Sequence, residues 1–129
     1  MTSGEGRTLR GAARDLEAAR LLLEAGFTDQ AVSRAYYAAF AAAEEALMAL
    51  GETRSKHAGV ISAFGALVVR DGGFDRLLGK VVGRLFRLRN EADYGAEDVP
   101  ADTAEQAVDD AGRFVDGVRT WLAARSHDR

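Results

Sequence analysis

The sequence predicts an all-α protein, an antiparallel up-and-down bundle of four to five helices that forms a single domain over residues 1–129. Apolar residues recur every three or four positions in five segments, as on one face of a helix. No strand-length stretch alternates between apolar and polar residues, and the only proline, Pro100, falls between two of the segments. We expect residues 1–7 and 126–129 to fray, as chain ends commonly do.

Two helices are expected in the first part of the chain, from about 9 to 25 and from about 28 to 50. Gly26 and Gly51 suit the left-handed turns that would end them, and Thr28 is the expected N-cap of the second. The apolar face of the first helix holds Leu9, Ala12, Leu16, Ala19 and Leu23. The apolar face of the second holds Val32, Tyr36, Phe40, Ala43, Leu47 and Leu50. A small-residue flank of the second, which a neighbouring helix can approach closely, holds Ala31, Ala35, Ala38 and Ala42.

The third helix is expected to begin after Ser55, its natural N-cap, and to break at the Asp-Gly-Gly turn of residues 71–73. Its inward side chains are predicted to be Val60, Ile61, Phe64, Leu67 and Val68. A fourth helix is expected from about Phe74 to Tyr94. Its predicted apolar set is Leu77, Leu78, Val81, Val82, Leu85, Phe86 and Leu88.

The fifth helix follows a loop over residues 95–101. Asp102 and Glu105, three residues apart, resemble a capping box at its start. Its predicted buried side chains are Val108, Ala111, Phe114, Val115, Val118, Trp121 and Leu122. Because the connections are short, neighbouring helices are expected to pack antiparallel.

The composition excludes several classes of site. The chain has no cysteine, so it can form neither a disulfide nor a thiolate metal site. It has no glycine-rich loop after a strand and no Glu-x-x-His pair, so we expect no nucleotide cofactor and no metal. The net charge of -3 offers no global attraction to nucleic acid, so such a role needs a local basic patch. Without a signal-like N-terminus or a run of ~20 apolar residues, we expect a cytoplasmic protein with no membrane contact.

Polar side chains interrupt the apolar face of the fourth helix near its end. Arg89 and Asp93 are four residues apart and therefore share a face, and Asn90 and Tyr94 form a second such pair beside them. A bundle ordinarily places apolar residues there. The structural alternative is an ion pair that closes the core, with Tyr94 as the last packed aromatic residue. The segment 89–94 is our main candidate for a functional site.

Basic side chains form a stripe along the same predicted helix. The stripe consists of Arg76, Lys80, Arg84 and Arg87, at spacings of four, four and three residues. At ~1.5 Å per residue it would be about 16 Å long. It could follow the phosphates of an RNA strand, although an ordinary solvated face is the alternative. Lys56 and His57 stand at a helix start, where free N–H groups can bind an anion, but His57 could instead close the core.

Three segments, in this order along the chain, resemble HEPN-domain proteins of a small bacterial and archaeal branch. They are residues 33–40 (SRAYYAAF), Ser55-Lys56-His57 with Val60, and residues 89–94 (RNEADY). The resemblance implies a HEPN-like bundle of four or five helices that forms homodimers. Such proteins are often encoded beside a minimal nucleotidyltransferase, as toxin with antitoxin. Many members cut RNA without metal, in a cleft formed across the dimer.

The resemblance also implies roles for individual residues. The family's catalytic pattern is an arginine and a histidine with four to six residues between them, and the arginine would be Arg89. The positions where histidine is expected hold Tyr94, Gly95 and Ala96, with Asp93 close by. In related pairs the nucleotidyltransferase adds AMP to a tyrosine near the arginine, which makes Tyr94 the candidate for modification. The added negative group would block phosphate entry beside Arg89.

Two hypotheses about function remain open. In a metal-independent endoribonuclease, Arg89 would clamp the phosphate, Asn90 would orient it, and Asp93 or His57 would be the base. A free aspartate titrates near pH ~3.9 and a free histidine near pH ~6.5, so His57 is better matched to neutral pH. Further phosphates would meet Lys56, Lys80, Arg84 and Arg87. The alternative is a non-catalytic dimeric module that binds a nucleotide or RNA. Either the Arg89 face or the small-residue flank would form the dimer.

Overall fold

The computed structural model describes the backbone of residues 3–95 and 97–127 and the side chains of residues 8–95 and 97–126. These residues contain five α-helices and no strand, so the predicted all-α bundle is confirmed. The helices are α1 (Ser3–Glu24), α2 (Thr28–Ala49), α3 (His57–Ala63), α4 (Val81–Tyr94) and α5 (Ala101–His127). A π-helical stretch η1 (Phe64–Arg70) continues α3, and a short 3₁₀ turn η2 (Leu78–Lys80) leads into α4.

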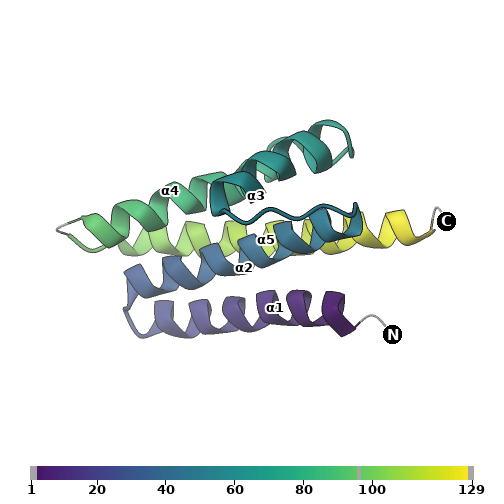
Figure 1. Ribbon diagram of the computed structural model, residues 1–129. Helices are drawn as coiled ribbons and strands as arrows, with labels where there is room; N and C mark the ends of the chain where they lie inside the picture. Colours follow the sequence, from purple (N-terminus) through teal and green to yellow (C-terminus); the bar gives the residue numbers. More distant parts are fainter. Residues whose placement is uncertain (1–2, 96, 128–129) are drawn as a thin grey trace.

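The helices pack around α2, which contacts α1, α5, α4 and α3. Figure 1 shows α1 and α2 as an antiparallel hairpin, with α3, η1 and α4 forming a second layer on the other side of α2. Residues 50–56 run back alongside α2 before α3 begins (Figure 1). This return path brings the start of α3 beside the middle of α2, rather than beside its end.

The core consists of the predicted apolar faces. Among its fully buried large side chains are Tyr36, Phe64, Phe114, Leu47 and Val32. Three phenylalanines from different elements meet ring to ring, with Phe64 5.2 Å from both Phe74 and Phe114 between ring centres. One predicted core residue is wrong, because Leu77 lies in the turn before η2 and is 75 % exposed.

The small-residue flank of α2 is used inside the chain. Ala31, Ala35, Ala38 and Ala42 have no exposed surface, in a helix that packs on α1 and α5. Small side chains let helix backbones approach closely, as expected, but the partner is the chain itself. The flank is therefore not available as a dimer face.

The predicted glycine stops are confirmed, whereas the predicted helix starts differ from the observed ones by one to seven residues. Gly26 and Gly51 have φ angles of +87° and +76°, in the left-handed region that glycine adopts without strain. Thr28 is the first residue of α2 rather than its cap, because the Phe27 carbonyl already accepts the Ala31 N–H at 2.9 Å.

The other corrected starts concern α3, α4 and α5. α3 follows Lys56, with no side-chain cap from Ser55. The predicted start at Phe74 is too early, because the Asp75 carboxylate accepts the Leu78 N–H at 2.8 Å and places the first turn there. α5 already includes Asp102, whose carboxylate accepts the Thr103 N–H at 2.8 Å in place of the predicted capping box.

Helix extends into both segments that we expected to fray, since α1 begins at Ser3 and α5 ends at His127. Residues 1–2 and 128–129 lie outside the described residues. Within the described ranges, no helix has a stretch both long enough and apolar enough to cross a lipid bilayer.

Candidate functional site

His57, the first residue of α3, lies on the aromatic face of α2. Its Nδ1 atom is 2.6 Å from the Tyr36 hydroxyl, and its ring stacks on Phe40 with 4.2 Å between ring centres. The ring centre of Phe86 on α4 lies 6.3 Å from that of His57. The side chain is half-buried, so it belongs to the wall of the bundle rather than to its centre. Tyr36 is in the core as predicted, but its hydroxyl reaches out to this histidine.

The Tyr36–His57 hydrogen bond leaves the other ring nitrogen of His57 for chemistry. Burial raises the pKa of the Tyr36 phenol above its usual value, while the charge of Arg89 opposes the rise. The phenol therefore stays protonated at neutral pH and holds Nδ1 as donor or acceptor, according to the imidazole tautomer. No hydrogen bond within residues 8–95 and 97–126 uses Nε2.

Arg89 of α4 reaches the same tyrosines. Its guanidinium carbon lies 5.5 Å from the ring centre of Tyr36 and 5.1 Å from that of Tyr37, which is cation–π distance. The side chain is 24 % exposed, and its buried Nε has no hydrogen-bond partner in the described part of the chain. Asp93 is the nearest carboxylate, 3.7 Å from Nε, too far for a hydrogen bond. Arg89 is thus a positioned cation with unused donors, as an anion site requires.

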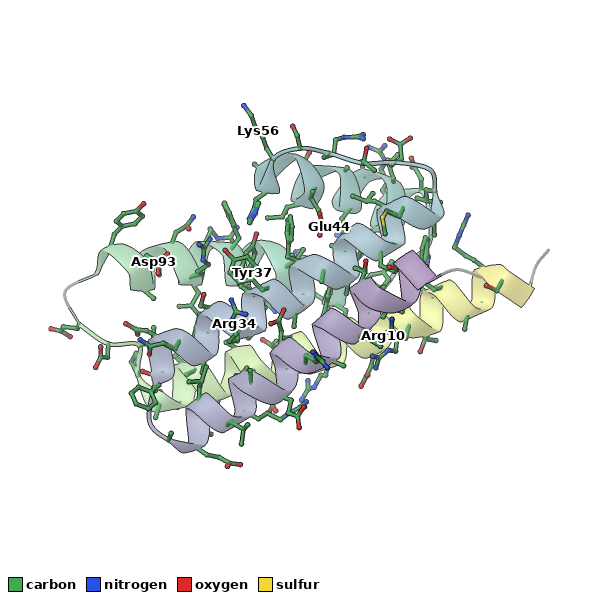
Figure 2. All side chains as sticks on the ribbon, turned by 60° about the horizontal axis from the view of Figure 1, so that its bottom comes forward. Arg10, Arg34, Tyr37, Glu44, Lys56 and Asp93 are labelled. Atoms are coloured by element: carbon green, nitrogen blue, oxygen red, sulfur yellow. The ribbon has the colours of Figure 1, made fainter. Side chains whose placement is uncertain are left out.

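Arg34 and Asp15 extend this group, and the sequence reasoning missed both as site residues. The Arg34 guanidinium carbon lies 5.1 Å from the ring centre of Tyr37, and its Nη1 donates to Asp15 of α1 at 3.0 Å. Figure 2 shows Tyr37 between α2 and α4, with Arg34 on the neighbouring turn. The signal was available, because Arg34 and Tyr37 are three residues apart on one helix face. We call Arg89, Tyr36, Tyr37, His57 and Arg34 the tyrosine–arginine cluster.

The other predicted members of the 89–94 segment lie at the edge of this cluster. Asp93 is 51 % exposed and Tyr94 is 90 % exposed, so neither is sealed under the bundle. No hydrogen bond or ion pair among the described residues joins Asn90 to Arg89. Lys56 is exposed and points away from the helices in Figure 2. Ala96, one of the positions expected to hold histidine, lies outside the described residues.

The predicted basic stripe faces a different way from Arg89. Arg84 and Arg89 are five residues apart on α4, which turns them about 140° from each other around the helix axis. Arg84 lies 3.5 Å from Asp110 of α5, and Arg87 lines the same groove between α4 and α5 beside Glu91. Lys80 and Arg76 are exposed, and Arg76 precedes the helix altogether. Acidic neighbours thus offset part of the stripe's charge, and the structure does not join it to the cluster.

Glu44 adds a carboxylate on the α3 side of α2, two turns beyond Tyr36 (Figure 2). Burial raises the pKa of Glu44 above its usual value, and a positive charge on His57 opposes the rise. Among residues 8–95 and 97–126 no group of three or more His, Asp or Glu side chains is arranged to hold a metal ion.

The raised pKa of Glu44 predicts a pH-dependent cost of folding. Below the unfolded pKa of 4.5, Glu44 is protonated in both the folded and the unfolded state, and it does not lower the free energy of unfolding. That stability is lost as the pH rises through the higher folded pKa, because the buried carboxyl must then ionise. Glu44→Gln should therefore raise the thermal midpoint at pH 7 and change it much less at pH 4, as measured by circular dichroism. Glu17→Gln, at an exposed position of α1, is the control. A gain of equal size at both pH values would contradict the prediction.

Comparison with known proteins agrees with the helical bundle. The family model described as the HEPN domain matches residues 6–121. A protein of Methanocaldococcus jannaschii named a putative toxin is 35 % identical over 86 % of this chain and 83 % of its own length. A UPF0332 protein of Gloeobacter violaceus is 30 % identical over 95 % of this chain and 99 % of its own length. A second M. jannaschii protein named a putative toxin is 26 % identical over 93 % and 82 %. The bundle, the three motifs and these matches together show that the chain belongs to the HEPN domain family.

Proposed function

We propose that this protein is a toxin-like HEPN protein that cleaves RNA without a metal ion, at the tyrosine–arginine cluster. The observation that carries the proposal is that His57 and Arg89 both contact Tyr36. Nδ1 of His57 lies 2.6 Å from the Tyr36 hydroxyl, and the guanidinium carbon of Arg89 lies 5.5 Å from the ring centre. Under this proposal His57, at the start of α3, does the work of the histidine that the family pattern would put at one of residues 94–96. Two relatives that carry the name putative toxin support the biological role.

The chemistry requires charge stabilisation and proton transfer. The 2′-hydroxyl of the RNA attacks the adjacent phosphorus, the bond to the 5′-oxygen breaks, and a 2′,3′-cyclic phosphate remains. Arg89 offers its unused donors to the phosphate oxygens, where negative charge develops. Nε2 of His57 takes the proton of the attacking 2′-hydroxyl and returns it to the departing 5′-oxygen. Tyr36 positions the ring through Nδ1 and does not itself react, because its raised pKa keeps it a phenol.

The alternative is an RNA- or nucleotide-binding module that does not cleave. One specific observation favours it, since the His57 ring is already stacked on Phe40 and bonded to Tyr36, as a packing histidine would be. Under this alternative Arg89 still binds a phosphate, and His57 only fixes α3 on α2.

The test is an RNA cleavage assay with purified protein and excess EDTA. The proposal expects fragments ending in 2′,3′-cyclic phosphate, and no cleavage of the same oligonucleotide with 2′-deoxy sugars. A protein that shifts labelled RNA on a gel but leaves it intact, with and without divalent cations, would decide for the binding module. Cleavage that stops in EDTA would contradict the metal-independent mechanism.

We further propose that a minimal nucleotidyltransferase acts as antitoxin by adding AMP to Tyr94. The side chain is 90 % exposed at the last residue of α4, so a modifying enzyme can reach it, and it stands five residues beyond Arg89 on the same helix. Mass spectrometry after co-expression with an adjacent nucleotidyltransferase gene should show the AMP adduct on Tyr94, and none in the Tyr94→Phe variant. An unmodified Tyr94 would argue against this regulation.

The working unit is proposed to be a homodimer. The small-residue flank of α2 is already buried, which leaves the Arg89 face, at the end of α4 that Tyr94 closes, as the remaining candidate. Sedimentation velocity of the wild type should give the mass of two chains, and Tyr94→Glu should weaken the association. A monomer at working concentration would remove the dimer from the proposal.

A further inference from the structure

Two arginines from different helices share one tyrosine ring. The guanidinium carbons of Arg34 on α2 and Arg89 on α4 each lie 5.1 Å from the ring centre of Tyr37. They therefore cannot be farther apart than twice that distance. Two cations within that distance add to one positive potential, which an anion bound beside Tyr37 would lower.

Both arginines retain unused donors. Arg34 uses Nη1 toward Asp15 at 3.0 Å, and its side chain is still 42 % exposed. Arg89 makes no hydrogen bond within the described part of the chain, since Asp93 stays at 3.7 Å. A guanidinium presents five N–H groups in a planar fork that suits phosphate oxygens. The contact with Tyr37 restrains each guanidinium in advance, which lowers the entropy lost on binding.

We propose that Arg34 is a second phosphate-binding residue of the RNA site, held beside Arg89 by the shared ring of Tyr37 and oriented by Asp15. This inference rests on the proposed function and deepens it, because it makes the ligand a strand with at least two phosphates rather than a mononucleotide. Arg89 takes the phosphate at which the bond breaks, close to His57. Arg34 takes a phosphate farther along the strand, on the α1 side of Tyr37.

The carboxylate of Asp15 beside Arg34 leads to opposite predictions for two substitutions. Burial raises the pKa of its carboxyl, while the charge and hydrogen bond of Arg34 oppose the rise. The carboxylate competes with RNA for the same guanidinium. Asp15→Asn keeps a hydrogen-bond acceptor next to Arg34 and removes the competing charge, so it should tighten RNA binding, whereas Arg34→Gln should weaken it. If the Arg34–Asp15 ion pair were only structural, Arg34→Gln and Asp15→Asn would both break it and would change RNA binding in the same direction.

The experiment measures equilibrium binding of a fluorescein-labelled, 2′-O-methylated single-stranded RNA, which cannot be cleaved, over a series of salt concentrations. Each phosphate contact on a single strand contributes about 0.7 to the slope of log K against log salt. Arg34→Gln and Arg89→Gln should each lower the slope by about that amount, and the double variant should lower it by both. A mononucleotide probe, 5′-AMP, should be insensitive to Arg34→Gln.

The Arg119–Asp116 pair on α5 supplies matched controls. Its arginine side chain is 45 % exposed, close to the 42 % of Arg34, and lies 3.8 Å from Asp116, which is more exposed than Asp15. Arg119→Gln and Asp116→Asn therefore make the same charge changes as Arg34→Gln and Asp15→Asn, away from the cluster. They should leave both affinity and slope at the wild-type values. Thermal denaturation of every variant checks the fold.

The outcomes separate the two claims. If Arg34→Gln keeps the wild-type slope while Arg89→Gln lowers it, the second phosphate contact is wrong and the proposed function stands. Equal weakening by Arg34→Gln and Asp15→Asn makes the pair structural and overturns the inference. If the α5 controls shift binding as much as Arg34→Gln does, the effect is general charge and the inference also fails. Wild-type protein that neither binds nor cleaves RNA removes the proposed function itself.

Discussion

Replacing His57 with glutamine should lower metal-independent RNA cleavage by roughly 10²–10⁴-fold, the usual contribution of a positioned acid or base. Affinity for the uncleavable RNA should change far less, because the phosphate contacts come from arginine. The effect belongs to Nε2, since Nδ1 is engaged by the Tyr36 hydroxyl at 2.6 Å. Single-turnover cleavage rates with saturating enzyme measure the chemical step directly.

The chain offers a control for this substitution in its second histidine. His127→Gln removes the same chemical group at the end of α5, and it should leave the rate unchanged. Tyr36→Phe should reduce the rate less than His57→Gln and shift the pH–rate profile, because it frees Nδ1 without removing the imidazole. A wild-type rate in His57→Gln, with the fold intact, would show that another group transfers the proton.

Arg89→Ala should reduce cleavage by about 10²–10³-fold, as the loss of one positioned donor to a developing oxyanion does. Unlike His57→Gln, it should also weaken RNA binding, because the cation contacts the phosphate before and during the reaction. Arg89→Lys tests the geometry, since it keeps the charge but loses the planar fork that lies over Tyr36 and Tyr37. We expect it to recover part of the affinity and little of the rate.

Circular dichroism decides whether these losses concern the site or the fold. Arg89 is only 24 % exposed and covers two rings, so Arg89→Ala removes packing as well as charge. If the variant is folded and cleaves as fast as the wild type, the cluster is not the active site. If cleavage falls only in proportion to the helical signal, the role of Arg89 is structural.

Local signals carried the prediction of the fold. Gly26 and Gly51 end their helices as expected, because a left-handed φ angle is a property of a few residues. The start of α4 was predicted too early because apolar spacing continues through the turn before η2. Phe74 still reaches the core there, against Phe64, without being helical. Asp75 was the available signal, since its carboxylate caps Leu78.

The candidate site was predictable only in part. Arg89 stood out because it breaks an apolar face, and the sequence suffices to see that. Its partners were not visible in the same way, because Tyr36 and His57 are 21 residues apart and meet only through tertiary packing. The basic stripe shows the opposite error, since spacing on one helix says nothing of acidic neighbours such as Asp110 on another.

Residues 50–56 run back along α2 before α3 begins (Figure 1). His57 therefore belongs to α3 by sequence but lies against Tyr36 and Phe40 of α2. From 51 to 56 none of these residues is buried, so they contribute little to what keeps the protein folded. Their number nevertheless determines where the His57 imidazole lies, because one extra or missing residue would displace it by about 3.3–3.6 Å of extended chain. Composition is therefore free to drift in this connection, whereas its length governs whether the two halves of the site meet.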